Sequence, residues 1–400
     1  MKTVDIIFRE DLYPRFNPNQ ALIQNYANAI EHLPPIKINQ NNILIDGFHR
    51  WKAHQLAGRT EIKADVIETT SEKELKRLAY QLNSNHGLQL SNDEKRKYAA
   101  EMIAEMSVKE LANVLSVDES TIKRWTETQR KALEEERNRK IIDLYLRAWN
   151  TQQSIADMFG IDKATVNRVL QNVQMHEMQQ DFEPPLYNIL NLSKQDSLID
   201  SHFGSFPLYF MKSLLYFHTK PFDIIFDPFA GGGTTVDACK EMMRRYYCTD
   251  LIVKPGREKD ILQHDITKGL PDNLPKPDMV FLDPPYWKQA EGKYSDSEND
   301  LANMSLDAFY AAMNKLFTEI ANRKINKIAL IIQPTQYANN LVLEDHVFMF
   351  DKMLCNKYEI EMRYILPYST QQYNAQMVEK AKEEKVCLVL NRDLIIWRFK

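Results

Sequence analysis

The sequence predicts an α/β fold for the carboxy-terminal half, preceded by a small α+β segment and an all-α region. Two apolar runs, residues 222–227 and 279–283, indicate the α/β part because each ends in Asp and is followed by a loop. Open α/β sheets bind their ligands in the crevice at the carboxyl ends of the strands. A repeated helical spacing between residues 91 and 174 indicates the all-α region. We therefore expect one ligand crevice and a separate helical module.

Composition limits the kind of protein. The chain has 400 residues, of which 44% are hydrophobic, so two or three domains can each have a core. A net charge of −4 gives no support to a polyanionic partner, so any nucleic-acid site must rest on local features. The four cysteines lack Cys-x-x-Cys spacing, so we expect no metal site and no disulfide framework. No apolar run approaches the ~18 residues of a membrane span, so we expect a cytoplasmic, nucleoid-associated protein.

Residues 1–90 mix short strands with helices. A strand ends at Asp46 and Gly47, and a helix runs from His49 and Arg50 to Gly58. Backbone N–H groups and basic side chains in a first helical turn can bind phosphate. The candidate nucleotide or phosphate contacts are therefore Asp46, Gly47, His49 and Arg50.

This segment resembles the ParB/sulfiredoxin-like nucleotide-binding fold, and residues 13–17 lie near that family's first conserved box. The resemblance leaves the activity open, because members bind CTP, bind ATP or have only been called nucleases. Residues 47–50 read Gly-Phe-His-Arg where partition proteins usually have Gly-Glu-Arg-Arg. A nonenzymatic platform that orients DNA is the alternative.

Residues 91–175 contain the spacing of a helix-turn-helix unit twice. A small residue lets two helices cross closely, a turn residue permits the bend, and a branched residue packs the second helix. These positions are Ala112, Ser116 and Ile122 in the first unit, and Ala156, Gly160 and Val166 in the second. A charged helix from residue 126 to about residue 149 joins the units.

The exposed positions of each second helix are the candidate DNA contacts. Arg and Lys can bind guanine or phosphate, and Asn can bind adenine. The candidates are Ser120, Thr121, Lys123 and Arg124 in the first unit, and Lys163, Thr165, Asn167 and Arg168 in the second. Plain helical packing units are the alternative, since residues 91–170 carry almost no net charge.

The loop after residue 227 has three glycines, which let the backbone approach a ligand closely. It lacks the Gly-Lys-Ser/Thr of a phosphate-binding loop and the third glycine of the dinucleotide fingerprint. Two further strands, at residues 245–250 and 261–265, end in Asp250 and Asp265. These carboxylates could bind ribose hydroxyls and an adenine amino group. The pattern indicates an adenosine without a phosphate tail.

The order of these segments resembles the S-adenosylmethionine-dependent DNA amino-methyltransferases over residues 186–400. Residues 227–235 look like the family's DPFxGSGTT loop, with Gly232 where Ser is common, and residues 283–286 look like its DPPY motif. Residues 201–207 resemble its His-Pro-x-x-Phe-Pro region, from which Phe203 departs. The resemblance implies a Rossmann-like methyltransferase fold with a mixed seven-stranded sheet and S-adenosylmethionine as cofactor. Its implied cofactor contacts are Asp227, Pro228, Phe229, Ala230, Gly231, Gly233, Thr234, Thr235, Asp250, Asp265, Phe206 and Pro207.

The tetrapeptide Asp283, Pro284, Pro285 and Tyr286 is the candidate catalytic motif. An exocyclic amino nitrogen is a poor nucleophile because its lone pair is delocalised into the ring. Asp283 and the Pro284 carbonyl could accept its two hydrogens, the rigid prolines fix their direction, and Tyr286 could stack on a base turned out of the duplex. A proline-rich turn with Tyr286 in packing is the alternative.

The remaining elements follow from apolar periodicity. We expect helices at residues 208–219, 235–244 and 306–322, and strands at 328–333, 358–366, 386–390 and 394–399. Residues 289–300 are polar and acidic, as in a mobile loop over the crevice.

These features predict a DNA methyltransferase that modifies adenine N6, because cytosine-N4 enzymes more often have Ser in place of Asp283. No inserted recognition region follows the catalytic motif, so recognition of double-stranded DNA falls to the amino-terminal half. The predicted domains are 1–90 (ParB-like), 91–175 (tandem helix-turn-helix) and 176–400 (methyltransferase). A homodimer is one expected assembly of the chain. The alternatives are a cytosine-N4 enzyme, an RNA substrate, or a partition or transcription regulator with a non-catalytic methyltransferase domain.

Overall fold

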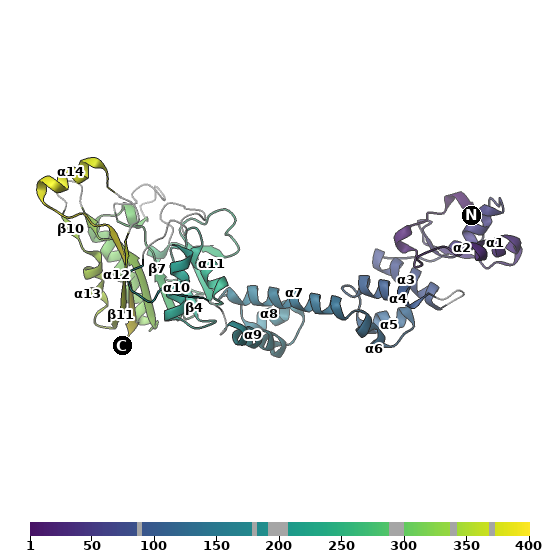
Figure 1. The fold of residues 1–400 in the computed structure, drawn as a ribbon, viewed down its shortest axis with the longest axis horizontal. Helices are drawn as coiled ribbons and strands as arrows, with labels where there is room; N and C mark the ends of the chain where they lie inside the picture. The colour runs from purple at the N-terminus through teal and green to yellow at the C-terminus, as the bar shows by residue number, and fades with distance from the viewer. Residues whose placement is uncertain (86–89, 178–181, 191–206, 288–299, 337–341, 368–372) are drawn as a thin grey trace. The chain divides into compact units, whose positions relative to one another are not determined.

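The computed structural model describes residues 1–85, 90–177, 182–190, 207–287, 300–336, 342–367 and 373–400 (Figure 1). The chain divides into two compact units, Met1–Arg137 and Asn138–Lys400. The domain limits at residues 90 and 175 stay predictions. In the described ranges, every helix is too short or too polar to cross a lipid bilayer.

The amino-terminal unit begins with a small α+β domain, as predicted. Its sheet has the order β2-β1-β3. The strands are β1 (Ile36–Ile38), β2 (Leu44–Asp46) and β3 (Ala64–Val66), and the helices are α1 (Gln20–Asn28), α2 (Phe48–Leu56) and α3 (Glu72–Asn85). Ile36, Ile38, Leu44 and Trp51 form its core.

The predicted helical region follows as α4 (Asn92–Met102), α5 (Val108–Leu115), α6 (Glu119–Trp125) and α7 (Glu127–Leu146). Ser107 and Glu110 form a capping box that starts α5, and Ser116 ends it in the left-handed conformation. Ala112 and Ile122 are buried between α5 and α6. The first helix-turn-helix geometry is therefore confirmed.

The second helix-turn-helix belongs to the carboxy-terminal unit. It consists of α8 (Gln152–Phe159) and α9 (Lys163–Glu177). Gly160 ends α8 with φ +61°, and Ala156 and Val166 are fully buried. This prediction is confirmed as well.

The carboxy-terminal unit contains the predicted mixed seven-stranded sheet, in the order β11-β12-β8-β7-β4-β5-β6. Its strands are β4 (Ile224–Asp227), β5 (Arg245–Asp250), β6 (Ile261–Gln263), β7 (Met279–Leu282), β8 (Lys327–Ile332), β11 (Tyr358–Pro367) and β12 (Asn391–Phe399). Only β12 runs antiparallel to its neighbours in this sheet. The strand order reverses between β4 and β7, which is the topological switch point where α/β sheets bind ligands.

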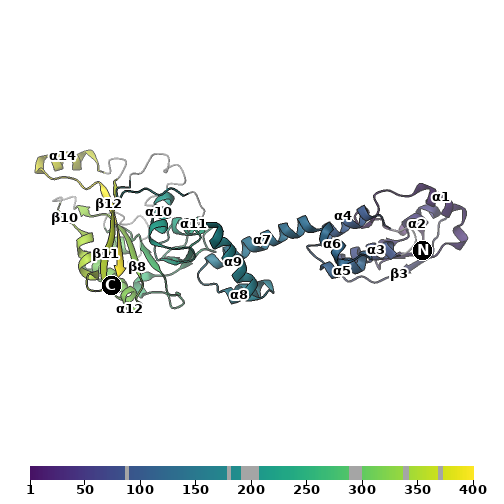
Figure 2. The ribbon, with the colours of Figure 1, turned by 60° about the horizontal axis from the view of Figure 1, so that its bottom comes forward.

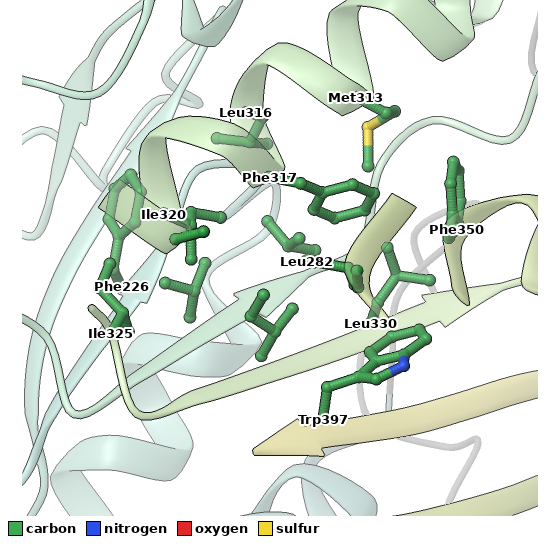
Figure 3. Packing of buried hydrophobic residues seen from close by; sticks show 14 of the residues in the cluster. Phe226, Leu282, Met313, Leu316, Phe317, Ile320, Ile325, Leu330, Phe350 and Trp397 are labelled. Carbon is green, nitrogen blue, oxygen red and sulfur yellow. The ribbon is translucent and has the colours of Figure 1, made fainter. Parts of the chain in front are cut away.

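Helices cover both faces of this sheet. They are α10 (Leu208–His218), α11 (Thr234–Glu241), α12 (Leu306–Asn322) and α13 (His346–Leu354). A further helix, α14 (Ala375–Glu384), covers neither face. Figure 3 shows Met313, Leu316 and Phe317 of α12 packed over the sheet with Phe350 of α13 close by. Residues of α10 and α11 form the core on the other face. The result is the Rossmann-like α/β fold.

One predicted strand is wrong. Residues 386–390 are irregular, and their backbone groups form hydrogen bonds with side chains instead of with a neighbouring strand. Gln336 donates to the Cys387 carbonyl at 2.9 Å and accepts from the Val389 N–H at 2.8 Å. Helices α13 and α14 and the small sheet of β9 (Thr335–Gln336) and β10 (Leu343–Glu344) were not predicted. Both β10 and α14 lie at the end of the large sheet away from the chain's C-terminus (Figures 1 and 2).

Candidate active site

The glycine loop joins β4 to α11 and is held by a buried carboxylate. Asp227 is 2% exposed, and it accepts hydrogen bonds from the Phe229 N–H at 2.8 Å and the Thr235 hydroxyl at 2.5 Å. Burial raises the pKa of Asp227 to about 7, the two hydrogen bonds oppose this rise, and the charges of Asp283 and Asp250 add to it. Pro228, Ala230 and Thr234 complete the loop.

Two glycines of this loop adopt left-handed backbone conformations, with φ +49° at Gly231 and +90° at Gly233. A Cβ atom at Gly233 would lie 2.9 Å from the Arg257 guanidinium, which itself forms two hydrogen bonds with Asp237 in α11. A Cβ at Gly231 would meet only the Phe229 carbonyl, at 3.8 Å. Gly233 therefore cannot be replaced without strain, whereas the backbone at Gly231 is open to a ligand.

Asp250 ends β5, which pairs with β4, and Asp265 follows β6, the next strand of the sheet. Asp250 accepts the Gly231 N–H at 2.7 Å and the Ile252 N–H at 3.0 Å, and burial raises its pKa. Asp265 accepts the Thr267 hydroxyl at 2.6 Å. Burial alone would raise the pKa of Asp265, but the hydrogen bonds from Thr267 hold it below its usual value. Three carboxylates thus line the carboxyl ends of β4, β5 and β6.

Asp283 directly follows β7, which pairs with β4, so Asp283 and Asp227 lie on adjacent strands. Burial raises the pKa of Asp283 to about 7, while the charge of Arg392 and a hydrogen bond from the Tyr286 side chain act in the opposite direction. Pro284 is buried, and Pro285 and Tyr286 are partly exposed. The structure therefore brings the two predicted motifs to one edge of the sheet.

Trp287 anchors the loop that carries Tyr286. Its indole N–H donates to the Met304 carbonyl at 2.8 Å, and its ring lies edge-on to His346 with centroids 6.3 Å apart. His346 is fully buried, and its ring nitrogens contact the hydroxyls of Tyr310 at 2.9 Å and Thr335 at 3.0 Å. Burial lowers the pKa of His346 to about 4, so this ring is neutral at physiological pH.

The candidate DNA contacts lie mainly on exposed surfaces. Thr121 and Thr165 are half-buried, and the Thr165 N–H donates to Asp162 at 2.6 Å. The Arg168 guanidinium donates to the Thr165 hydroxyl at 3.2 Å, and Lys123 lies 3.9 Å from Glu119. The exposed candidates are Ser120, Lys123, Arg124, Lys163, Asn167 and Arg168.

The candidate phosphate contacts of the amino-terminal domain serve local structure. His49 is buried, and its Nε2 accepts the Asn19 N–H at 3.0 Å. Burial lowers the pKa of His49 to about 4, so it adds no charge at neutral pH. Arg50 pairs with Asp46 at 2.9 Å, and Gly47 begins α2 with φ +104°. A nucleotide contact by these residues stays a prediction.

Phe206 and the 289–299 part of the predicted mobile loop lie outside the described residues, whereas Pro207 begins α10. In the described part of the chain, no three His, Cys, Asp or Glu side chains gather as a bound metal would require. Sequence reasoning missed Arg257 behind Gly233 and Arg392 near Asp283. The only sequence signal for Arg392 is a charge at the start of an apolar strand.

Sequence reasoning also missed Arg245, which attaches the second helix-turn-helix to the sheet. From the start of β5, its guanidinium donates to the carbonyls of Tyr145 at 2.9 Å, Ala148 at 3.1 Å and Asn150 at 2.7 Å. The Ala148 N–H donates to the Tyr246 carbonyl at 2.9 Å. The segment before α8 is therefore fixed at the amino end of β5, away from the candidate active site.

A family profile described as DNA methylase matches residues 43–253, more than half of the chain. The match includes the glycine loop and Asp250 and ends before Asp283. No curated protein matches the chain.

Among solved structures, TrmN from Thermus thermophilus is similar over 50% of this chain and 50% of its own, with 13% identity and a TM-score of 0.34. The similarity thus spans half the length of that protein. The truncated chromosome-partitioning protein ParB from Caulobacter crescentus, complexed with the parS site, is similar over 43% of this chain and 97% of its own, with 14% identity and a TM-score of 0.26. At these TM-scores the similarities support no conclusion, and the fold rests on the strand order.

Proposed function

Because the chain belongs to the DNA methylase family, we propose that it transfers a methyl group from S-adenosylmethionine to the N6 amino group of adenine in double-stranded DNA. One observation carries the proposal. The glycine loop after β4 and the Asp-Pro-Pro-Tyr loop after β7 lie on paired parallel strands, at the switch point of the sheet. A cofactor on the first loop and a base on the second would meet there.

The residues around the glycine loop fit S-adenosylmethionine. The open backbone at Gly231 allows close approach, and the carboxylate of Asp250 can accept hydrogen bonds from ribose hydroxyls. Asp265 can accept one from the adenine amino group. When bound, the cofactor supplies an electrophilic methyl group on its sulfonium. The acidic side chains of Asp227 and Asp250 favour a positively charged ligand at this edge, and such a ligand would in turn favour their ionised forms.

Asp283 and the Pro284 carbonyl would accept the two hydrogens of the target amino group. In this structure the Tyr286 side chain forms a hydrogen bond with the Asp283 carboxylate. A target amino group would take the place of Tyr286 as the hydrogen-bond donor to this carboxylate. The Tyr286 ring can then stack on the base, and the prolines limit movement of the loop. Positioning and electrostatics supply most of the catalysis.

The choice of adenine over cytosine is supported by Asp rather than Ser at position 283. The test is to incubate the purified chain with S-adenosylmethionine and DNA and to identify methylated nucleosides by mass spectrometry. We expect N6-methyladenine from the wild type, none from Asp283→Ala, and an unchanged yield from Asp272→Ala, which replaces an exposed carboxylate before β7. N4-methylcytosine would refute the adenine assignment, and methylation by Asp283→Ala would refute the catalytic role.

Target recognition by the amino-terminal half is part of the proposal. Lys123 and Arg124 of α6 line one shallow surface pocket together with four residues of α7, and the four cations of the pocket outnumber its two carboxylates. The α7 residues are Glu127, Arg130, Lys131 and Glu134. Replacing Lys123 and Arg124 by Ala should weaken DNA binding at every sequence and reduce the slope of log K against log salt by about 2. Fluorescence anisotropy over a salt series measures this slope. Lys109→Ala, at an exposed position of α5, is the matched control, and an unchanged slope in the double variant would contradict the assignment.

A further inference from the structure

Arg392 is a buried cation at the carboxyl edge of the sheet. It is the second residue of β12, and only 5% of it is exposed. The neighbouring Asp393 pairs with Arg363 at 3.0 Å, on the edge strand β11. Burying a guanidinium is costly unless a partner of opposite charge or a set of acceptors stabilises it. Arg392 is therefore a buried charge, and the groups around its guanidinium lie on the inner side of the sheet.

The strand registers place Arg392 on the same face of the sheet as Asp283. Side chains alternate along a strand, and Leu394 of β12 and Phe281 of β7 both belong to the core beneath α10 and α11. Arg392 lies two residues before Leu394, and Asp283 lies two residues after Phe281. Both side chains therefore belong to that face.

The same registers place the two residues close together along the strands. Asp393 pairs with Ile332, and Leu282 pairs with Leu330, so Arg392 and Asp283 lie just beyond these pairs and two residues apart along β8, which is about 7 Å. Only β8 separates β12 from β7, which corresponds to about 10 Å between the outer strands. An extended arginine side chain can cross this gap.

We propose that Arg392 is a positioning residue for the methyl transfer: its guanidinium keeps the Asp283 carboxylate ionised, so that Asp283 can accept a hydrogen from the target amino group. The inference rests on the proposed function. Three groups that carry a charge or a labile proton face Asp283 in the described structure. These are Arg392 from β12, Tyr286 from the same loop and Asp227 from β4.

The balance of these groups explains why a cation is needed. Asp283 is substantially buried beside a second buried carboxylate, and both effects favour its protonated form. A protonated Asp283 would present a donor instead of an acceptor to an amino hydrogen. The charge of Arg392 lowers the pKa of Asp283 against the larger effect of burial. Without Arg392, Asp283 would be mainly protonated at neutral pH.

The test is to measure the titration of Asp283 in Arg392→Met. Carbon-13 resonances of labelled Asp carboxyls report it directly, and the resonance that disappears in Asp283→Asn identifies the residue. We expect the midpoint to rise by at least about one pH unit, as for loss of a nearby opposite charge. Arg392→Lys should restore much of the shift. Arg398→Met removes an exposed arginine, paired with Glu359, from the other end of β12 and should not change the midpoint.

The pH profile of methylation is the second measurement. In Arg392→Met, kcat should fall at least about fivefold near neutral pH and recover at higher pH, because the acid limb follows Asp283. A merely structural role would reduce kcat by the same factor at every pH. An unchanged midpoint in Arg392→Met, or in Arg392→Gln if the Met variant does not fold, would overturn the inference. If the midpoint of Asp283 shifts in Arg392→Met but the wild type methylates no DNA, the proposed function is overturned and the inference on Arg392 is not.

Discussion

The stability of Asp227→Asn relative to the wild type should increase as the pH rises. Asp227 is almost fully buried, and burial raises its pKa to about 7. Asn has nearly the same shape and can keep both hydrogen bonds. Its amide oxygen can accept the Phe229 N–H, and the Thr235 hydroxyl can turn to accept the amide N–H. The variant thus removes the ionisation with little change in packing.

The magnitude follows from proton linkage. The ordinary pKa of Asp is 3.8, so between 3.8 and about 7 the native state binds a proton that the unfolded state has lost. The free energy of unfolding of the wild type therefore falls as pH rises through this range, by about 4 kcal/mol in total. About 3 kcal/mol of this loss develops between about pH 5 and about pH 8. Asn does not titrate, so the stability of Asp227→Asn relative to the wild type should rise by about 3 kcal/mol over that interval.

Calorimetric unfolding of the full chain between about pH 5 and about pH 8 measures the effect. The expected gain corresponds to roughly 6 to 12 °C in Tm for a unit of this size. A constant cost of the buried amide cancels, because only the change with pH is compared. Asp272→Asn, at an exposed carboxylate before β7, is the control. A difference between variant and wild type that stays constant, or that shrinks as the pH rises, would refute the reasoning.

Two further predictions concern the supports of the site. Gly233→Ala should cost about 1–3 kcal/mol and weaken S-adenosylmethionine binding at least about tenfold by isothermal titration, because φ is +90° and Arg257 blocks a Cβ. Gly256 has φ +86° but open space around a Cβ, so Gly256→Ala should lower stability without weakening cofactor binding. Equal losses of binding in the two variants would contradict the assignment of the glycine loop as the cofactor site. Arg245→Met should cost about 3 kcal/mol in urea unfolding, because three carbonyls lose a charged donor. Arg398→Met, which breaks an exposed pair, should cost under about 1 kcal/mol, and a similar cost for both would count against the anchoring role of Arg245.

The parts of the site that the sequence predicts are those that local chemistry determines. The short apolar runs before Asp227 and Asp283 have the length and composition of buried strands, and Gly233 stands where the backbone needs a positive φ. In the same way, the small, turn and branched residues of each helix-turn-helix contact only residues a few helical turns away in the sequence. Such features need no knowledge of the rest of the fold.

The parts that the sequence does not predict depend on contacts between distant segments. Residues 386–390 have the composition of a strand, but Gln336 and Tyr373 bind their backbone instead. His49 was expected near a phosphate, yet its ring accepts a backbone N–H from the start of α1. The roles of Arg245 and Arg392 likewise follow from strand pairing. Single-sequence periodicity carries no information on such pairs.

The anchored position of α8 and α9 limits how the chain could read DNA. Arg245 fixes the segment before α8 at the amino end of β5, whereas Asp250 and the cofactor loop lie at its carboxyl end. A strand of this length spans about 17 Å. Base pairs in B-DNA are about 3.4 Å apart along the axis, so this span corresponds to about five base pairs. If the duplex that carries the target base runs parallel to β5, base pairs level with the anchored segment before α8 lie about five positions from that base, and those nearest the target are then contacted by other parts of the chain.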